Sequence, residues 1–419
     1  MKKSKIWLLL FCFIFFGIAC SASAGSLIPA KQLLIARLQS TDFGYDDSFK
    51  KSSGTVSCEL QNVSGSMVPP DDKVVKVLAG AKLSFDYKLN VPEKKLEMNY
   101  QLNARKDSYR GSIFINNDKI ILSKEVLLLL SLVDPKALDT AEYSALPPYG
   151  YLAGREIAKL WDVALNPDVK DILPAYRELL VFIAEAVPDK YFTTSLADQK
   201  IIFHLDQEGL ADVIFAVMQK VRGEKERFAE LVARLVVLSD PAENAEAVKA
   251  EVISGIEEGI RNGAFPGSPG EVQKSLSGVF ELEDMIFEVP FLPSGKSRFT
   301  LVANLGGNSQ FTGKISVDAS FAGSKENYKG AYDIVFSGRE KRQDISGRIM
   351  NEFEKTGPDS KNNGLVRCKM TDLNGTKTLL DLSVLFDSNA RAGENVPVNI
   401  PRLTESNSVN ITEYRGKIS

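Results

Sequence analysis

Apolar and polar residues alternate one by one over long stretches in the last third of the chain. The clearest stretch is 311–321, where Phe311, Ile315, Val317 and Phe321 are separated by polar or small residues. Successive side chains of a strand point to opposite faces of a sheet, so this period of two predicts one face in water and one buried face. We therefore expect a broad antiparallel sheet with apolar groups packed against it.

Strand-like segments occur in two groups, on either side of a helical region. Residues 55–122 and 279–386 contain the strand-like segments, joined by short polar connections that are typical of hairpins. Residues 123–262 have mostly helical spacing. This order favours an α+β fold, in which a large curved antiparallel sheet (a half-barrel) has helices packed on its concave face.

The best helix of the middle region is expected over 207–221, with Asp206 as its N-terminal cap. A lone strand is expected just before it, over 201–205. Two aromatic segments, 143–151 and 191–195, are expected to be loops that either edge a binding mouth or pack over the core.

A curved sheet with helices over its concave face can leave an apolar gap, and ligand pockets are concave and mainly apolar. Protein interiors are also close-packed, so the same side chains equally fit a filled core, and the sequence leaves both readings open. The candidate cavity residues are Leu210, Val213, Val217, Phe311, Ile315, Val317 and Phe321.

Residues 1–24 have the parts of a secretory signal peptide. Three lysines precede an apolar run over 6–16, and small residues end at Ala24. The run is shorter than the roughly 20 residues that span a bilayer. We expect export, with 25–388 as a single α+β unit and 389–419 as a polar C-terminal tail.

A second processing route is open at the same place. The segment from Gly17 to Ser21 resembles a bacterial lipobox, in which Cys20 is lipidated and becomes the first residue. Gly17 stands where that motif usually carries leucine. Cleavage after Ala24 predicts a free exported protein, and lipidation at Cys20 predicts one tethered to a membrane surface.

Cleavage after Ala24 leaves only two cysteines, Cys58 and Cys368. In an oxidising compartment a disulfide between them is one expectation, and two separate buried thiols are the other. Two cysteines and one distant histidine do not form a zinc site.

The chain has 51 basic and 54 acidic residues and a formal net charge of −3. The leader contains three lysines and no acidic residue, so its removal makes the chain more acidic. This balance gives no electrostatic basis for binding nucleic acid.

No catalytic motif stands out. His204 is the only histidine, and no G-x-S-x-G accompanies it, so we expect a strand residue in water or a satisfied core position. The spacing of Glu281, Glu283, Asp284 and Glu288 suits the wet side of a strand. Calcium-loop and phosphate-loop patterns are absent. We expect no enzymatic activity and no cofactor, and a carboxylate hydrolase is the least favoured alternative.

In its element order over roughly 27–386 the chain resembles the LolA/LppX-type extracytoplasmic lipoproteins. The shared order is a leader, a helix at 27–38, antiparallel strands and a block of helices. The large helical middle and the lipobox at 17–20 depart from the pattern of that family. The resemblance implies an unclosed barrel with a helical plug, whose cavity carries lipids or lipidated proteins between membranes.

Together these features predict an exported, non-enzymatic binding or carrier protein for a hydrophobic ligand such as a lipid, at the bacterial cell envelope. The alternative is a structural or protein-interaction component of the envelope, with a filled core and no ligand.

Overall fold

The structure is a computed structural model of the 419-residue chain. The described residues are 29–40, 50–68, 79–104, 106–127, 140–165, 169–239, 243–277, 279–291, 295–306, 311–324, 326–340, 343–393 and 395–411. The expected signal peptide (1–24) and lipidation site (Cys20) lie outside them.

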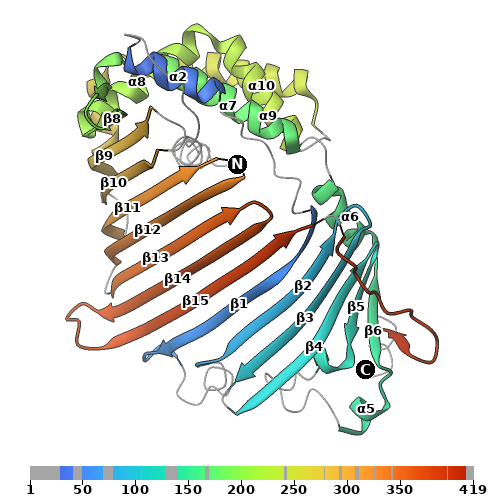
Figure 1. The fold of residues 1–419 in the computed structure, drawn as a ribbon. Helices are drawn as coiled ribbons and strands as arrows, with labels where there is room; N and C mark the ends of the chain where they lie inside the picture. The colour runs from blue at the N-terminus through green and yellow to red at the C-terminus, as the bar shows by residue number, and fades with distance from the viewer. Residues whose placement is uncertain are drawn as a thin grey trace. The chain divides into compact units, whose positions relative to one another are not determined.

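These residues form an α+β protein whose sixteen strands belong to one large, mostly antiparallel sheet (Figure 1). This confirms the expected fold class, a large curved antiparallel sheet accompanied by helices. Contacts divide the chain into two compact units, whose bounds differ from the single unit expected over 25–388. Unit 1 is Met1–Tyr45 with Pro167–Lys341, and unit 2 is Asp46–Asn166 with Arg342–Ser419.

Within the described residues, unit 1 combines six strands with a layer of helices. The strand order is β12-β11-β10-β9-β8-β7. The strands are β7 (Phe192–Ser195), β8 (Lys200–Leu205), β9 (Phe280–Pro290), β10 (Ser297–Leu305), β11 (Phe311–Gly323) and β12 (Asn327–Glu340). The helices are α2 (Ala30–Ser40), α7 (Val169–Ala186), η3 (Asp189–Tyr191), α8 (Gln207–Gly223), α9 (Lys225–Ser239), α10 (Ala245–Arg261) and α11 (Pro269–Leu276).

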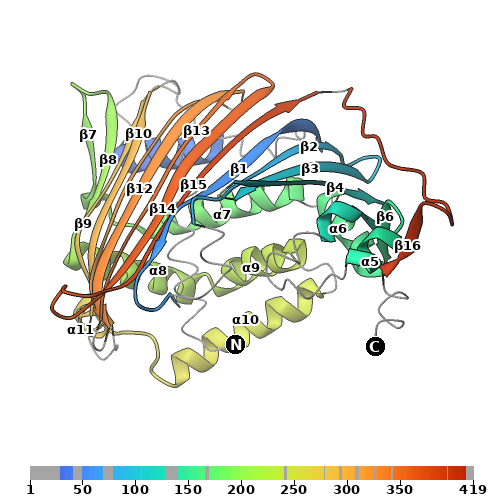
Figure 2. The same ribbon diagram turned by 90° about the horizontal axis from the view of Figure 1, so that it is seen from below.

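Helices of unit 1 cover one side of its strands. α2 packs on β7 and β8, and α8 packs on β8 and β9. α9 packs between α7 and α10, and the three helices run side by side (Figure 2). Alternation in β9, with a register shift between Leu282 and Asp284, places Leu282, Met285, Phe287 and Val289 on the covered side, each no more than 7% exposed. The helix layer therefore gives unit 1 a filled core.

The start of α8 is capped as expected. The Oδ1 atom of Asp206 accepts a hydrogen bond from the Gly209 N–H at 2.8 Å. This bond satisfies one of the backbone donors that a helix leaves unpaired at its first turn. The cap sets the direction in which α8 leaves β8 and so positions Leu210, which is 2% exposed, against Met285.

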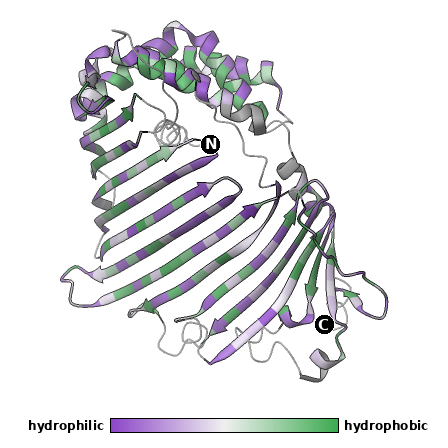
Figure 3. Ribbon diagram, viewed as in Figure 1, coloured by the Kyte–Doolittle hydropathy of each residue, from purple (hydrophilic) through white to green (hydrophobic). Residues whose placement is uncertain are grey.

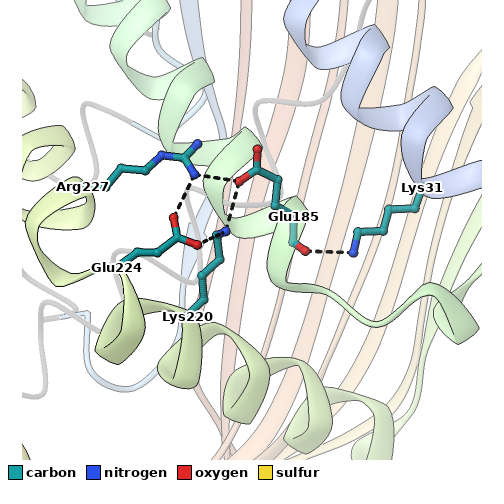
Figure 4. Close-up of polar contacts among 5 residues, drawn as sticks. All are labelled: Lys31, Glu185, Lys220, Glu224 and Arg227. Carbon is teal, nitrogen blue, oxygen red and sulfur yellow. Dashed lines mark hydrogen bonds and ion pairs between the residues drawn. The ribbon is translucent and has the colours of Figure 1, made fainter.

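A network of ion pairs ties the helices of unit 1 together (Figure 4). Glu185 of α7 lies 3.2 Å from Lys220 of α8 and 3.0 Å from Arg227 of α9. Glu224, at the end of α8, pairs with the same two cations at 2.7 and 2.9 Å. Hydrogen bonds from Lys220 and Arg227 lower the pKa of Glu224. Lys31 of α2 donates to the backbone carbonyl of Glu185 at 2.8 Å.

Both predictions of an aromatic loop in the middle region are wrong in part. Tyr149–Ala153 is strand β6, and Phe192–Ser195 is strand β7. β7 pairs with β8, and the Phe192 ring lies 4.9 Å from that of Phe203. β8 is not a lone strand either, because it lies between β7 and β9. Segments of four or five residues show too few alternations for the sequence to reveal them.

Within the described residues, unit 2 is built mainly of strands, in the order β16-β6-β5-β4-β3-β2-β1-β15-β14-β13. The first segment of unit 2, Asp46–Asn166, contains the strands β1 (Lys51–Ser64), β2 (Lys82–Asn90), β3 (Lys95–Ala104), β4 (Asp107–Asn116), β5 (Lys119–Ser123) and β6 (Tyr149–Ala153). Its second segment, Arg342–Ser419, contains β13 (Gln343–Thr356), β14 (Asp359–Asp372), β15 (Thr378–Ala392) and β16 (Ser408–Asn410). The helices are η2 (Lys124–Leu127), α5 (Thr140–Ala145) and α6 (Arg155–Leu165).

The expected polar tail is partly built into unit 2. β15 continues to Ala392, past the expected tail start at 389. β16 then pairs parallel with β6. The side chain of Ile411 occupies the space that a Cβ on Gly150 would need, 2.8 Å away, so the end of the chain packs closely on β6.

The filled core of unit 1 predicts a large effect of shortening Leu210. We expect Leu210→Ala to lower the free energy of unfolding by about 2–5 kcal/mol, because the deletion leaves a cavity among buried side chains. Leu196 is 80% exposed, so Leu196→Ala should change it by less than about 0.5 kcal/mol. Urea unfolding followed by circular dichroism measures both free energies. Equal stability of the two variants would contradict the close packing of Leu210 between α8 and β9.

Candidate functional site

The register of unit 2 defines one continuous side of its strands. Phe386 in β15 lies opposite Cys58 in β1 and Gly364 in β14. Cys58 lies opposite Leu83 in β2, which in turn lies opposite Leu102 in β3. Residues directly opposite one another in antiparallel pairs share a face. These positions, and every second residue from them, therefore lie on one side of the sheet.

We call this side the apolar face. Its central members are Val56, Leu60, Leu83, Phe85, Ile349, Val366, Leu382, Val384 and Phe386. Charged residues such as Glu59 and Lys88 lie on the opposite side, where Arg367 pairs with Asp381 at 3.4 Å. Figure 3 shows hydrophobic and hydrophilic positions alternating along these strands.

The apolar face is less covered than the corresponding side of unit 1. Among the described residues, no hydrophobic side chain of β1, β2, β13 or β14 is buried. The extensive contacts of β1, β2 and β13–β15 are all with neighbouring strands, whereas β3 also contacts η2 through the Tyr100 hydroxyl. Contiguous apolar surface open to water marks sites of interaction. The apolar face is therefore the candidate functional site.

Two aromatic rings of the apolar face lie against glycines of the next strand. A Cβ on Gly364 would come within 2.3 Å of the Phe386 ring, and one on Gly111 within 2.6 Å of the Tyr100 ring. Because glycine has no side chain, a ring on the neighbouring strand can lie over it and shield the backbone. The Phe386 ring is half-buried and remains partly accessible on the apolar face.

Towards β4 the apolar face is closed by η2, which packs on that strand. Tyr100 is 3% exposed, and its hydroxyl donates to the backbone carbonyl of Glu125 at 3.1 Å. Burial, with the charge of Glu125 adding to it, raises the pKa of Tyr100 to about 12. The phenol therefore stays protonated at neutral pH. Over β1, β2 and β13–β15 the large apolar side chains of the face are mostly half-buried, whereas its polar members Ser52, Asn351 and Lys355 are buried.

The segment after β15 contacts the opposite side. Glu97 is one residue away from Met98, which lies on the apolar face, so Glu97 points to the other side. It accepts a hydrogen bond from the Asn399 N–H at 3.1 Å and pairs with Lys88 at 3.4 Å. The chain around Asn399 therefore contacts a polar group on the side of β3 opposite to the apolar face.

The candidate cavity residues named from the sequence are only partly brought together. Leu210, Val213 and Ile315 meet in one cluster of unit 1, where Leu210 is buried. Val217 belongs to a second cluster, between helices. The helix residues among them pack in filled clusters rather than along an open cavity.

The other three candidates lie on β11. Val317 and Phe321 are half-buried, and the Phe321 ring is 5.7 Å from that of Tyr328. Phe311 begins the strand opposite Glu340, and its side chain is outside the described part. The apolar side chains of unit 2 were not named as candidates from the sequence. A sequence shows the alternation of apolar residues, but it does not show whether another element packs on one side of the sheet.

The charged residues of unit 1 lie mostly in water and are paired. His204, on β8, is exposed, and its Nε2 atom lies 2.8 Å from Oδ1 of Asp284. Glu283 bonds to Lys314 at 2.6 Å, and that hydrogen bond lowers the pKa of Glu283. The expected placement of His204 on a strand in water, and of the β9 carboxylates on its wet side, is confirmed.

A depression of about 450 Å³ lies on the wet side of β8–β10. It is lined by charges of both signs that satisfy one another. Lys200 pairs with Glu288 at 3.0 Å, and Arg298 pairs with Asp318 at 2.7 Å. Across the described ranges, no three His, Cys, Asp or Glu side chains are grouped so that they could hold a metal ion. The described helices include none that is both long and apolar enough to cross a membrane.

Comparisons with known proteins add no family to this picture. No protein-family model matches the chain, and no curated protein matches it significantly. The resemblance to the LolA/LppX-type lipoproteins therefore stays an expectation based on element order.

The expected disulfide between Cys58 and Cys368 is not formed. Both thiols are free, with Cys58 exposed and Cys368 half-buried. Cys58 lies opposite Phe386 and Cys368 opposite Leu382, so β15 runs between their strands. Two strand spacings already separate backbones by about 9 Å, more than the roughly 7 Å that a disulfide can bridge.

We expect both thiols to react in the folded protein without a reductant. Iodoacetamide should modify Cys58 faster than Cys368, because Cys58 is exposed and Cys368 is half-buried. Peptide mass analysis after alkylation measures both rates. Recovery of a linked peptide containing Cys58 and Cys368 would contradict the structure.

The close approach of Phe386 to Gly364 predicts an unusual response to a single methyl group. Gly364→Ala should destabilise the protein by about 1–3 kcal/mol, because the new Cβ would also lie 2.4 Å from the Met350 carbonyl oxygen. Gly255, inside α10, has open space at its Cβ position, so Gly255→Ala should stabilise by about 0.5–1 kcal/mol. Urea unfolding of both variants tests the difference in sign.

Proposed function

We propose that the protein is an exported, non-enzymatic binding or carrier protein for a hydrophobic ligand such as a lipid, at the bacterial cell envelope. The observation that carries the proposal is the apolar face, whose large apolar side chains on β1, β2 and β13–β15 are mostly half-buried and whose strands there make no extensive contact with a described helix. The leader supports export. The resemblance to the LolA/LppX-type lipoproteins supports a lipid as the ligand. Lipidation at Cys20 stays the alternative to a free exported form.

The dimensions of the apolar face suit an acyl chain. β15 has 15 residues, so at about 3.3 Å per residue it extends for about 50 Å. The hydrocarbon core of a bilayer is only about 30 Å thick. A lipid tail can therefore lie along the strands without reaching beyond them.

The energetics also favour binding by burial of the tail. Each methylene removed from water contributes about 0.8 kcal/mol, so ten contribute about 8 kcal/mol. The loss of free motion on binding costs about 4–15 kcal/mol. The net affinity is then modest unless the head group adds contacts, which suits a carrier that must release its ligand.

A structural or protein-interaction role in the envelope is the second candidate. A broad apolar side of a sheet also accepts a partner protein, and the filled helical clusters of unit 1 are typical of a stable scaffold. The two functions differ in what occupies the apolar face of protein purified from its source, which is an extractable lipid in one case and a bound polypeptide in the other.

A matched pair of substitutions in β15 tests the lipid-binding proposal. Val384 lies on the apolar face, and its neighbour Leu385 lies on the opposite side; both are half-buried. Val384→Asn should weaken uptake of a fluorescent fatty acid about tenfold, because an amide beside the tail loses hydrogen bonds to water. Leu385→Asn should leave the affinity unchanged. A fluorescence titration measures both dissociation constants.

Thermal melting of both variants controls for folding, since either change can alter stability. Native mass spectrometry of the wild-type chain is the independent measurement and should show a co-purified lipid. Equal effects of the two substitutions, or absence of any fatty-acid uptake together with a tightly bound protein, would favour the second candidate.

A further inference from the structure

Two exposed hydrophobic side chains lie at the end of unit 2 where β1 and β14 end and β15 begins (Figure 1). Met67, just after β1, is 58% exposed, and Leu373, in the turn between β14 and β15, is 41% exposed. The Met67 N–H donates to the backbone carbonyl of Leu379 at 2.8 Å, which holds the end of β1 against the start of β15. We call residues 66–68 and 372–377 together the tip.

The turn that carries Leu373 is held by its own hydrogen bonds. The carboxylate of Asp372 accepts from the N–H of Lys377 at 3.0 Å, and from the N–H and the hydroxyl of Thr376, both at 2.8 Å. These bonds, with the one from Lys377 foremost, lower the pKa of Asp372. Gly375, with a φ of 65°, supplies the left-handed position. Nothing in this turn requires a leucine, because turn positions in water are usually filled by small polar residues.

The apolar face continues along the strands as far as the tip. Every second residue of β15 from Phe386 to Leu380 is apolar. Leu380 lies opposite Met370 of β14, which lies opposite Ile345 of β13. Val63 of β1 lies opposite Leu382. These side chains are half-buried. An acyl chain that lies along the strands therefore has a continuous apolar path to this end of the sheet.

The tip carries little charge. Of its residues only Asp372 and Lys377 are charged, and the carboxylate of Asp372 is bonded within the turn. Lys377 is exposed, and a lysine can place its apolar stem beside hydrocarbon while its ammonium group stays in water. Transfer of the tip into an apolar phase therefore removes Met67 and Leu373 from water without burying an unpaired charge.

We propose that the tip inserts into the surface of a lipid bilayer, so that an acyl chain passes there between the membrane and the apolar face. This inference rests on the proposed function and adds to it the place where the lipid enters and leaves. Two inserted side chains give weak and reversible docking, as expected from the marginal membrane binding of a single lipid anchor. Reversible docking suits a carrier that has to leave the membrane again.

Exposure alone does not select the tip. Leu196, in the turn between β7 and β8 of unit 1, is 80% exposed, more than either hydrophobic residue of the tip. Its turn also contains Asp198, which lines the charged depression together with Lys200 and Lys296. Insertion of that turn into a bilayer would remove water from several charges. Leu196 is therefore a matched control for the tip.

A tryptophan placed at the tip tests insertion directly. In Leu373→Trp the emission should move to shorter wavelength on addition of vesicles of equimolar phosphatidylcholine and phosphatidylglycerol, and brominated acyl chains should quench it. Leu196→Trp should show neither effect. The native residues Trp7 and Trp161 occur in both variants, and the wild-type signal is subtracted. Equal effects in the two variants, or no effect in Leu373→Trp, would overturn the inference.

Removal of the two apolar side chains tests the role of the tip in transfer. In the full-length chain, M67N/L373N should pass a bound fluorescent fatty acid to the same vesicles about tenfold more slowly than the wild type, because it docks less well. Its affinity for the fatty acid without vesicles should be unchanged, since both residues lie beyond the apolar path. L196N/V279N is the control, because Leu196 and Val279 are 80% and 62% exposed in unit 1, and it should transfer at the wild-type rate.

The outcomes separate this inference from the proposed function. Wild-type protein that takes up no fatty acid contradicts the proposed function. Uptake with a transfer rate that M67N/L373N does not change contradicts only the docking of the tip, as does a tip that binds a protein and leaves vesicles untouched. Thermal melting checks folding, and if the double variant does not fold, Leu373→Asn takes its place and should still slow transfer. All variants share one N-terminus, so lipidation at Cys20 does not alter the comparison.

Discussion

The alternation of apolar and polar side chains along antiparallel strands is the constraint on which the rest of this structure depends. It provides every strand with one apolar side, which costs free energy for as long as water touches it. In unit 1 helices provide the cover, and Leu210 of α8 and Met285 of β9 are both buried. In unit 2 the same alternation leaves Val384 and Phe386 half-exposed. One pattern thus supports a filled core in one unit and a half-buried apolar side in the other.

Polar groups near apolar surface in this structure differ in whether they have a hydrogen-bond partner. Tyr100 is buried but donates to the Glu125 carbonyl, and the helix network around Glu185 matches carboxylates with cations. Such satisfied groups stabilise the fold. The amide oxygens of Asn351 and Asn362 are buried without a partner.

Much of the fold could be predicted from patterns within a few residues. The alternation over 311–321 and the cap at Asp206 follow from local spacing, and the structure bears them out. For His204 the sequence left a strand position in water and a core position open, and the structure shows the first. The short strands β6 and β7 were missed because four or five residues carry little periodicity, and their pairing partners supply most of the ordering. The candidate cavity residues were chosen from apolar spacing alone, which does not show which apolar sides of the strands are packed against helices.

By itself, the chain of amino acids determined where the longer strands and helices form, the mildly acidic charge and the absence of catalytic motifs, since each depends on composition or on near neighbours. Only the tertiary structure decided that Leu210 faces a filled core and that β15 separates Cys58 from Cys368. It also brought Asn351 beside Asn362 on an otherwise apolar side. The physical reason is strand register: it joins residues far apart in the chain, and no local pattern records which strand will lie next to which.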